Sequence, residues 1–146
     1  MVDKTFRFLL LIAVMAVAPL ALAGDDPAHE RHELMEGVKD AAKPIGQMLK
    51  GELDYDVELV VQSLETFADA GASLGDLFPA GSEGGEAAPA IWEDRAGFDD
   101  ALNQWRTATD GAIAARPETV EAAKPILGKV FGACKNCHDS YRIEDE

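Results

Sequence analysis

The chain has 146 residues, of which 47% are hydrophobic and 27% are charged, and its formal net charge is −14 at pH 7. Such an acidic surface repels phosphate, which argues against nucleic acid and anionic lipid as partners. The length predicts one domain with one hydrophobic core.

The first 23 residues have the features of a secretory signal peptide. Lys4 and Arg7 precede an apolar run that is too short to span a bilayer comfortably and that ends in Ala21-Leu22-Ala23, the small-x-small pattern of a signal peptidase site. An uncleaved anchor is the alternative, but Pro19 and the small residues favour cleavage. We therefore expect residues 24–146 to form the mature domain, which is exported to the periplasm and keeps no membrane segment.

Two helices are predicted in the first half of the mature chain. The first opens at Asp25-Asp26-Pro27, an acidic cap followed by proline at the first helical position, and should end near Gly51. Pro44 lies inside its pattern and predicts a kink about one turn earlier. The second helix starts within residues 54–56 and carries a regular apolar stripe that continues as far as Phe78.

A segment rich in glycine and proline, residues 79–90, is predicted to be an ordered loop or crossover. The third helix is predicted over 91–115 and the fourth from Pro117 to about Tyr141, with a kink at Pro125. Four amphipathic helices with one long crossover predict an all-α fold, an antiparallel four-helix bundle. Cofactors in such bundles bind between facing helices.

Both cysteines of the chain lie in the sequence CKNCH, residues 134–138, on the fourth helix. Positions i, i+3 and i+4 share one face of a helix, so Cys134, Cys137 and His138 point toward the same object. C-x-x-C-H is the attachment signature of c-type haem. We therefore predict one haem c, bound covalently through two thioether links, with His138 as an axial iron ligand.

Three alternatives to haem attachment could account for these cysteines. Redox disulfide motifs usually open a helix after a strand, and no strand is predicted here. A zinc site would need a fourth ligand, and His29 and His32 do not form a second spaced pair. The third alternative is that the CKNCH pentapeptide occurs by chance. We favour haem because an exported chain with both cysteines in this motif has little other use for them. Five aromatic residues are candidates for its apolar walls: Phe78, Trp92, Phe98, Trp105 and Phe131.

The chain resembles the cytochrome c′ family, the class II c-type cytochromes, in three places. They are the C-terminal CKNCHDSYR, the segment GSEGGEAAPAIWEDRAGF, and Arg31, Met35 and Pro44 in the first helix. The resemblance covers the whole mature chain and implies a four-helix bundle, often a homodimer. It also implies a haem near one end of the bundle, with His138 as the proximal ligand of a five-coordinate, high-spin iron.

The resemblance implies roles for further residues. Arg31 would lie near a haem propionate, and Met35 would pack over the iron as an apolar lid without ligating it. Glu86 would lie beside the haem, where its backbone N–H would make any propionate contact because its carboxylate is repelled. His32 stands where family members usually carry glutamine, which changes the expected contact. Arg142 would either influence the proximal pocket or simply stabilise the end of its helix.

The sixth coordination position decides the function, because iron with two protein ligands transfers electrons and iron with one binds gases. Low-spin relatives of the cytochrome c-556 type use a methionine at the place of Met35 as the sixth ligand. Met35 as plain core is a third interpretation, and His29 and His32 carry little weight as distal ligands.

We favour a gas-binding haem protein that engages nitric oxide and, more weakly, carbon monoxide. Electron transfer with redox partner proteins is the alternative. No acid/base pair stands out in the sequence, so we expect no enzymatic activity and assign no catalytic residue.

Overall fold

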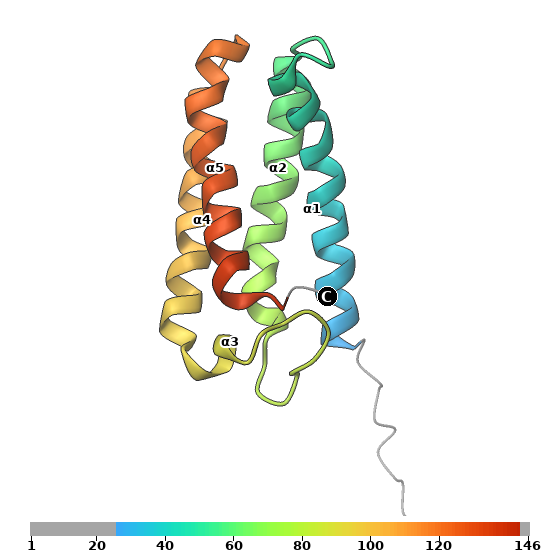
Figure 1. Cartoon of the computed structure of the whole chain (residues 1–146), viewed down its shortest axis with the longest axis vertical. Helices are drawn as coiled ribbons and strands as arrows, with labels where there is room; N and C mark the ends of the chain where they lie inside the picture. The colour runs from blue at the N-terminus through green and yellow to red at the C-terminus, as the bar shows by residue number, and fades with distance from the viewer. Residues whose placement is uncertain (1–25, 144–146) are drawn as a thin grey trace, which may run out of the picture.

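The computed structural model describes residues 26–143, so the predicted signal peptide lies outside the described residues. Four long helices run side by side as an antiparallel bundle (Figure 1). They are α1 (Pro27–Lys50), α2 (Val57–Leu74), α4 (Arg95–Ala115) and α5 (Val120–Tyr141). Two short elements, η1 (Gly75–Leu77) and α3 (Ala90–Glu93), belong to the crossover from α2 to α4. The all-α four-helix bundle predicted from the sequence is confirmed.

Capping groups set both ends of α1 and the start of α2 where the sequence predicted them. The Asp26 carboxylate accepts a hydrogen bond from the Ala28 N–H (3.1 Å) at the start of α1. Gly51 ends α1 in the left-handed conformation, with φ of 76°, which glycine adopts at little cost. The Asp56 carboxylate accepts from two N–H groups of the first turn of α2. α1 is assigned as one continuous helix through Pro44.

The other predicted boundaries need correction. Asp94 interrupts the third predicted helix with φ of −124° and ψ of 61°, and its carboxylate accepts from the Gly97 N–H (3.1 Å). It therefore caps α4, and the preceding turn is the separate α3. The apolar stripe of the second helix passes into η1 after Leu74. The fourth helix begins at Val120 rather than Pro117 because Thr119 caps it.

The four helices do not pack equally on one another. α1 packs on α2, α4 packs on α5, and contacts between α2 and α4 join the two pairs, whereas α1 and α5 make few contacts. The innermost side chains come from all four helices and include Ile45, Val60, Leu64, Phe67, Phe98, Ala112, Leu127 and Val130. The space between α1 and α5 is therefore not closed by direct helix packing. Within residues 26–143, no helix has the length and apolarity to cross a membrane.

Three arginines hold the chain where it leaves α2. Arg106 and Arg95 on α4 and Arg31 on α1 donate hydrogen bonds to backbone carbonyls within residues 71–78, at distances of 2.6 to 3.2 Å. The last carbonyls of a helix have no partner within it, and cations there also interact favourably with the helix dipole. These bonds fix the start of the crossover loop, residues 78–89, which crosses one end of the bundle (Figure 1).

Candidate haem site

A cavity of about 750 Å³ opens between the helices at the end of the bundle that carries the crossover loop. All four long helices, α3 and the crossover loop contribute to its lining. The cavity brings together seven residues that the sequence and the family resemblance assigned to the haem site: Arg31, His32, Met35, Glu86, Cys134, Cys137 and His138. Residues more than 100 positions apart in the chain therefore meet at one place.

The α5 wall carries the three residues of the C-x-x-C-H motif. Cys134 and Cys137 are partly buried and not joined in a disulfide, and burial raises the pKa of Cys134 to about 11 and also raises the pKa of Cys137. Desolvation by the surrounding cavity, and then the charge of Arg142, lower the pKa of His138. The wall thus presents two uncharged thiols and a neutral imidazole, the donor set that fits covalent haem attachment and iron ligation.

Aromatic rings form much of the remaining lining. Four of the five aromatic residues suggested from the sequence line the cavity, together with two that it did not suggest: Phe78, Phe98, Trp105, Phe131, Phe67 and Tyr141. Trp92 is outside the lining, and its indole N–H donates to the Pro79 carbonyl (3.1 Å). Flat apolar rings suit a large planar ligand, and Phe78 and Phe98 pack edge to face with centroids 4.8 Å apart.

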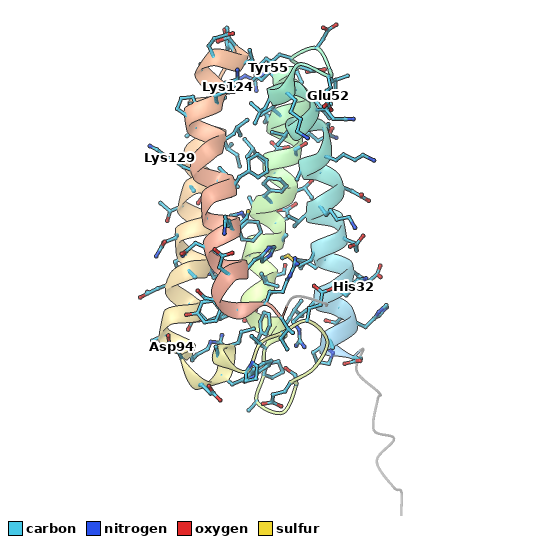
Figure 2. The ribbon with its side chains drawn as sticks, in the orientation of Figure 1. His32, Glu52, Tyr55, Asp94, Lys124 and Lys129 are labelled. Atoms are coloured by element: carbon cyan, nitrogen blue, oxygen red, sulfur yellow. The ribbon has the colours of Figure 1, made fainter. Side chains whose placement is uncertain are left out.

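The α1 wall has an apolar part and an exposed charged pair at its rim, Glu36 and Lys39, whose side chains are bonded to each other (2.6 Å). Met35, Val38 and Ala42 supply the apolar part, and Met35 is partly buried. His32 is exposed and lies toward the loop end of α1 (Figure 2), so it belongs to the rim. His29 does not line the cavity. Leu34, next to Met35 in the sequence, lies outside the lining and packs against the core.

Arg31 is 6% exposed, and its guanidinium is bonded to the crossover loop. Nη1 donates to the Leu77 carbonyl (2.7 Å) and the Ser82 hydroxyl (3.2 Å). Nη2 donates to the carbonyls of Ser82 (2.9 Å) and Gly84 (3.1 Å). The guanidinium carbon also lies 4.8 Å from the centroid of the Phe78 ring, and desolvation lowers the pKa of Arg31. The side chain lines the cavity while both Nη groups hold the loop.

Glu86 joins the crossover loop to the end of α5. Its carbonyl accepts a hydrogen bond from the Ile143 N–H (2.8 Å), and its carboxylate lies 3.6 Å from Nε of Arg142. Nearby, the Ala88 N–H donates to the Tyr141 carbonyl (3.0 Å). Sequence reasoning missed this pairing of loop and helix end, because it consists of backbone groups that any residue would supply.

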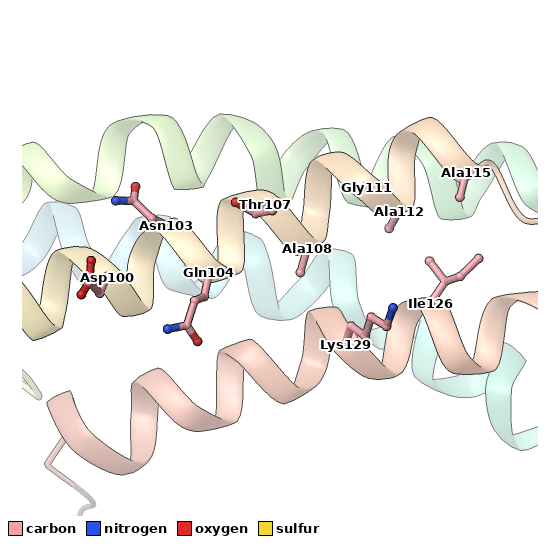
Figure 3. A pocket seen from close by; sticks show the side chains of 10 residues that line it. All are labelled: Asp100, Asn103, Gln104, Thr107, Ala108, Gly111, Ala112, Ala115, Ile126 and Lys129. Carbon is pink, nitrogen blue, oxygen red and sulfur yellow. The ribbon is translucent and has the colours of Figure 1, made fainter.

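A second hollow, also of about 750 Å³, lies between α4 and α5 (Figure 3). Eight residues of α4 and two of α5 line it: Asp100, Asn103, Gln104, Thr107, Ala108, Gly111, Ala112, Ala115, Ile126 and Lys129. It contains neither cysteine nor histidine, so it is not the candidate site. Among residues 26–143, no group of three or more His, Cys, Asp or Glu side chains gathers in a way that would hold a bare metal ion.

A C-x-x-C-H motif that faces a cavity between the helices of a four-helix bundle defines a c-type cytochrome of the helical-bundle class. A family model described as Cytochrome C' matches residues 26–142. The chain is 40% identical over 130 residues to cytochrome c' of Rhodopseudomonas palustris, an alignment that covers 85% of this chain and 86% of that protein. The chain therefore belongs to the cytochrome c′ family, and haem c is its cofactor.

Solved structures agree with this assignment. Cytochrome c' from Rhodopseudomonas palustris superposes with a TM-score of 0.80 at 37% identity, covering 84% of this chain and 100% of that one. A nitric oxide complex of a variant of cytochrome c prime from Alcaligenes xylosoxidans has a TM-score of 0.73 at 25% identity, covering 81% and 94%. A cytochrome c-556 of Agrobacterium fabrum is also similar, with 29% identity over 143 residues, covering 97% of this chain and 96% of that protein.

Proposed function

We propose that this protein is a periplasmic gas-binding cytochrome whose iron is five-coordinate and binds nitric oxide. One haem c would be joined to Cys134 and Cys137 by two thioether bonds, with His138 as the axial ligand. The observation that carries the proposal is the composition of the α1 wall, where Met35, Val38 and Ala42 line the cavity across from the motif. Bound haem supplies the iron, and the chain supplies one strong ligand and an apolar opposite face.

An apolar face discriminates among small gases because it offers no hydrogen-bond donor. Oxygen on ferrous haem carries partial negative charge and is favoured by a hydrogen-bond donor, whereas nitric oxide binds strongly without one. The partly buried Met35 would also crowd carbon monoxide. The charged pair on the α1 wall, Glu36 and Lys39, is exposed and bonded to itself (2.6 Å), which supports a gas-binding role rather than a catalytic one.

Two features of the comparisons support the proposal. The relative at 40% identity is a cytochrome c', whereas cytochromes c-556 of Agrobacterium reach 29 to 32%. The Alcaligenes protein, which has the same fold, is described as a nitric oxide complex. That description applies to the Alcaligenes protein and supports gas binding here by analogy.

A second candidate function rests on Met35 itself. Its thioether lies in the lining of the same cavity as His138, and a thioether is a soft ligand that haem iron accepts. A bond between Met35 and the iron would make the haem six-coordinate and low-spin. The protein would then exchange electrons with a redox partner protein, as the similarity to cytochromes c-556 suggests.

Export and assembly complete the proposal. Residues 1–23 would direct the chain to the periplasm and be removed, and the mature chain would form a homodimer. N-terminal sequencing of the purified protein tests cleavage after Ala23. Light scattering of the mature protein tests the dimer.

Titration of the ferrous protein with nitric oxide and carbon monoxide, followed by optical absorption, tests the gas-binding function. We expect stoichiometric binding of nitric oxide and weak binding of carbon monoxide. Failure to bind nitric oxide at stoichiometric concentration would overturn the proposal.

A further inference from the structure

The crossover loop is attached to both walls of the cavity, close to the two residues that decide the coordination of the iron. On α1 the attachment is Arg31, four residues before Met35 and therefore one helical turn away. On α5 the attachments are Tyr141 and the residues after it, three to five positions beyond His138. The loop therefore connects positions one turn from Met35 to positions one turn from His138.

The attachment to α1 is strong for a surface loop. Four hydrogen bonds from one guanidinium reach two carbonyls of the loop, one hydroxyl of the loop and the Leu77 carbonyl, and the guanidinium is almost wholly buried. Hydrogen bonds from a charged donor are about twice as strong as neutral ones. Gly84, one of the acceptors, has φ of 141°, a conformation that L-residues rarely adopt.

The attachment to α5 is made by backbone groups. The Ala88 N–H donates to the Tyr141 carbonyl (3.0 Å), and the Ile143 N–H donates to the Glu86 carbonyl (2.8 Å). These two bonds frame an antiparallel bridge between Ala87 and Arg142. The Arg142 N–H in turn donates to the His138 carbonyl (3.1 Å), so the bridged segment continues directly into the turn that carries the iron ligand.

Few contacts join α1 to α5 directly, so the relative position of the two walls depends on what connects them. At the loop end of the cavity that connection includes the crossover loop. Resting on the proposed five-coordinate site, we propose that Arg31 is a positioning residue: its bonds to the crossover loop fix the Met35 turn of α1 relative to the His138 turn of α5, and Met35 does not ligate the iron while these bonds are intact. This role differs from a propionate contact, because it acts through Nη1 and Nη2 bonds to the loop.

The test compares the ferrous optical spectra of the haem-loaded wild type, Arg31→Gln and Arg106→Gln. Arg106 is the matched control, because its Nε donates to the Gly71 carbonyl (2.6 Å) at the end of α2 but does not connect α1 to the loop. We expect a low-spin component in Arg31→Gln and a wild-type spectrum in Arg106→Gln. If half of the iron acquires the Met35 ligand, the apparent affinity for carbon monoxide falls about twofold.

The double variant Arg31→Gln with Met35→Leu identifies the new ligand. Leucine has no sulfur, so the low-spin component should vanish if it comes from Met35. A low-spin component that persists in the double variant would overturn the proposal. If Arg31→Gln does not load haem, Arg31→Lys replaces it, because lysine keeps the charge but cannot span four acceptors.

Hydrogen exchange of the loop amides shows whether the substitution has freed the crossover loop from α1. Faster exchange in residues 82–88 of Arg31→Gln with unchanged coordination would overturn the positioning role. A wild-type ferrous spectrum that is already low-spin would overturn the five-coordinate function and the positioning role together. A high-spin wild type with an unchanged spectrum in Arg31→Gln would overturn the positioning role alone.

Discussion

Met35 on α1 and His138 on α5 line the same cavity, although the two helices that carry them make few direct contacts. α2, α4 and the crossover loop connect the two walls (Figure 1). A planar ligand bound through α5 would then present its free face toward the apolar side of α1. The chemistry of that free face depends on whether the Met35 sulfur reaches the iron.

Covalent attachment of haem is the first prediction. Cys134, Cys137 and His138 share the α5 wall, so both thiols should form thioethers with one haem. Acid-acetone extraction should leave the colour with the protein, and the mass of the mature chain should rise by one haem. A colourless chain with all of its haem in the organic phase would contradict the prediction.

Replacement of Met35 by alanine is the second prediction. The change should leave the coordination number unchanged and speed the binding of carbon monoxide, because a lid is removed and no bond is lost. Each 1.4 kcal/mol of crowding that is relieved raises the rate about tenfold. Flash photolysis measures the rate, and Leu34→Ala is the matched control because Leu34 is adjacent in sequence but outside the cavity lining. A conversion from low-spin to high-spin in Met35→Ala would instead establish Met35 as a ligand.

The third prediction concerns discrimination between gases. Met35, Val38 and Ala42 on the α1 wall carry no side-chain hydrogen-bond donor. The ferrous protein should therefore bind nitric oxide tightly and carbon monoxide weakly, and it should form no stable complex with oxygen. Exposure of the ferrous protein to each gas in an optical cell checks the order. A stable oxygen complex that disappears in His32→Leu would show that His32 turns inward from the rim and acts as the donor.

The fourth prediction concerns the far end of the bundle. The Tyr55 hydroxyl donates to the Pro117 carbonyl (2.6 Å) and ties the α1–α2 connection to the α4–α5 connection, at the end away from Asp94 (Figure 2). Tyr55→Phe should lower the free energy of unfolding by about 1 kcal/mol, the usual net contribution of one hydrogen bond. Urea unfolding of the haem-loaded protein at pH 7 measures the difference, and equal stabilities would contradict the assigned bond.

The same tyrosine predicts a pH dependence. Burial raises the pKa of Tyr55 above 10.0, so the folded state holds this proton more tightly than the unfolded state. Its contribution to stability is therefore fully present below about pH 10 and is lost as the pH rises through the folded pKa. Tyr55→Phe lacks that group, so the stability difference between the variant and the wild type should shrink above pH 10. A constant difference up to pH 11 would contradict this linkage.

Local chemistry made both ends of α1 and the start of α2 predictable from sequence. Asp26, Gly51 and Asp56 act through their own side chain or backbone conformation, within four residues of the groups that they cap. Asp94 caps α4 in the same way through the Gly97 N–H. This cap could have been predicted from the sequence, but the helical apolar pattern continues across Asp94 and hid it. Helical periodicity alone therefore merges a single turn with the helix that follows it.

Site residues that share one face of a helix could be predicted from their spacing in the sequence. Contacts with backbone groups far away in the sequence could not. The spacing within residues 134–138 placed the motif on one side of α5. The partners of Arg31 are mostly carbonyls 46 to 53 positions away, and carbonyls carry no sequence signature. Glu86 illustrates both cases, because its place beside the cavity was expected and its backbone bond to Ile143 was not.

The optical spectrum of the gas-free ferrous protein at neutral pH tests the central claim most directly, because it distinguishes five-coordinate from six-coordinate haem in one measurement. We predict a high-spin spectrum with a single broad Soret band and no sharp α band, since His138 is the one axial protein ligand of the proposed site. A low-spin spectrum with sharp α and β bands that Met35→Ala abolishes would contradict the claim and identify an electron-transfer protein.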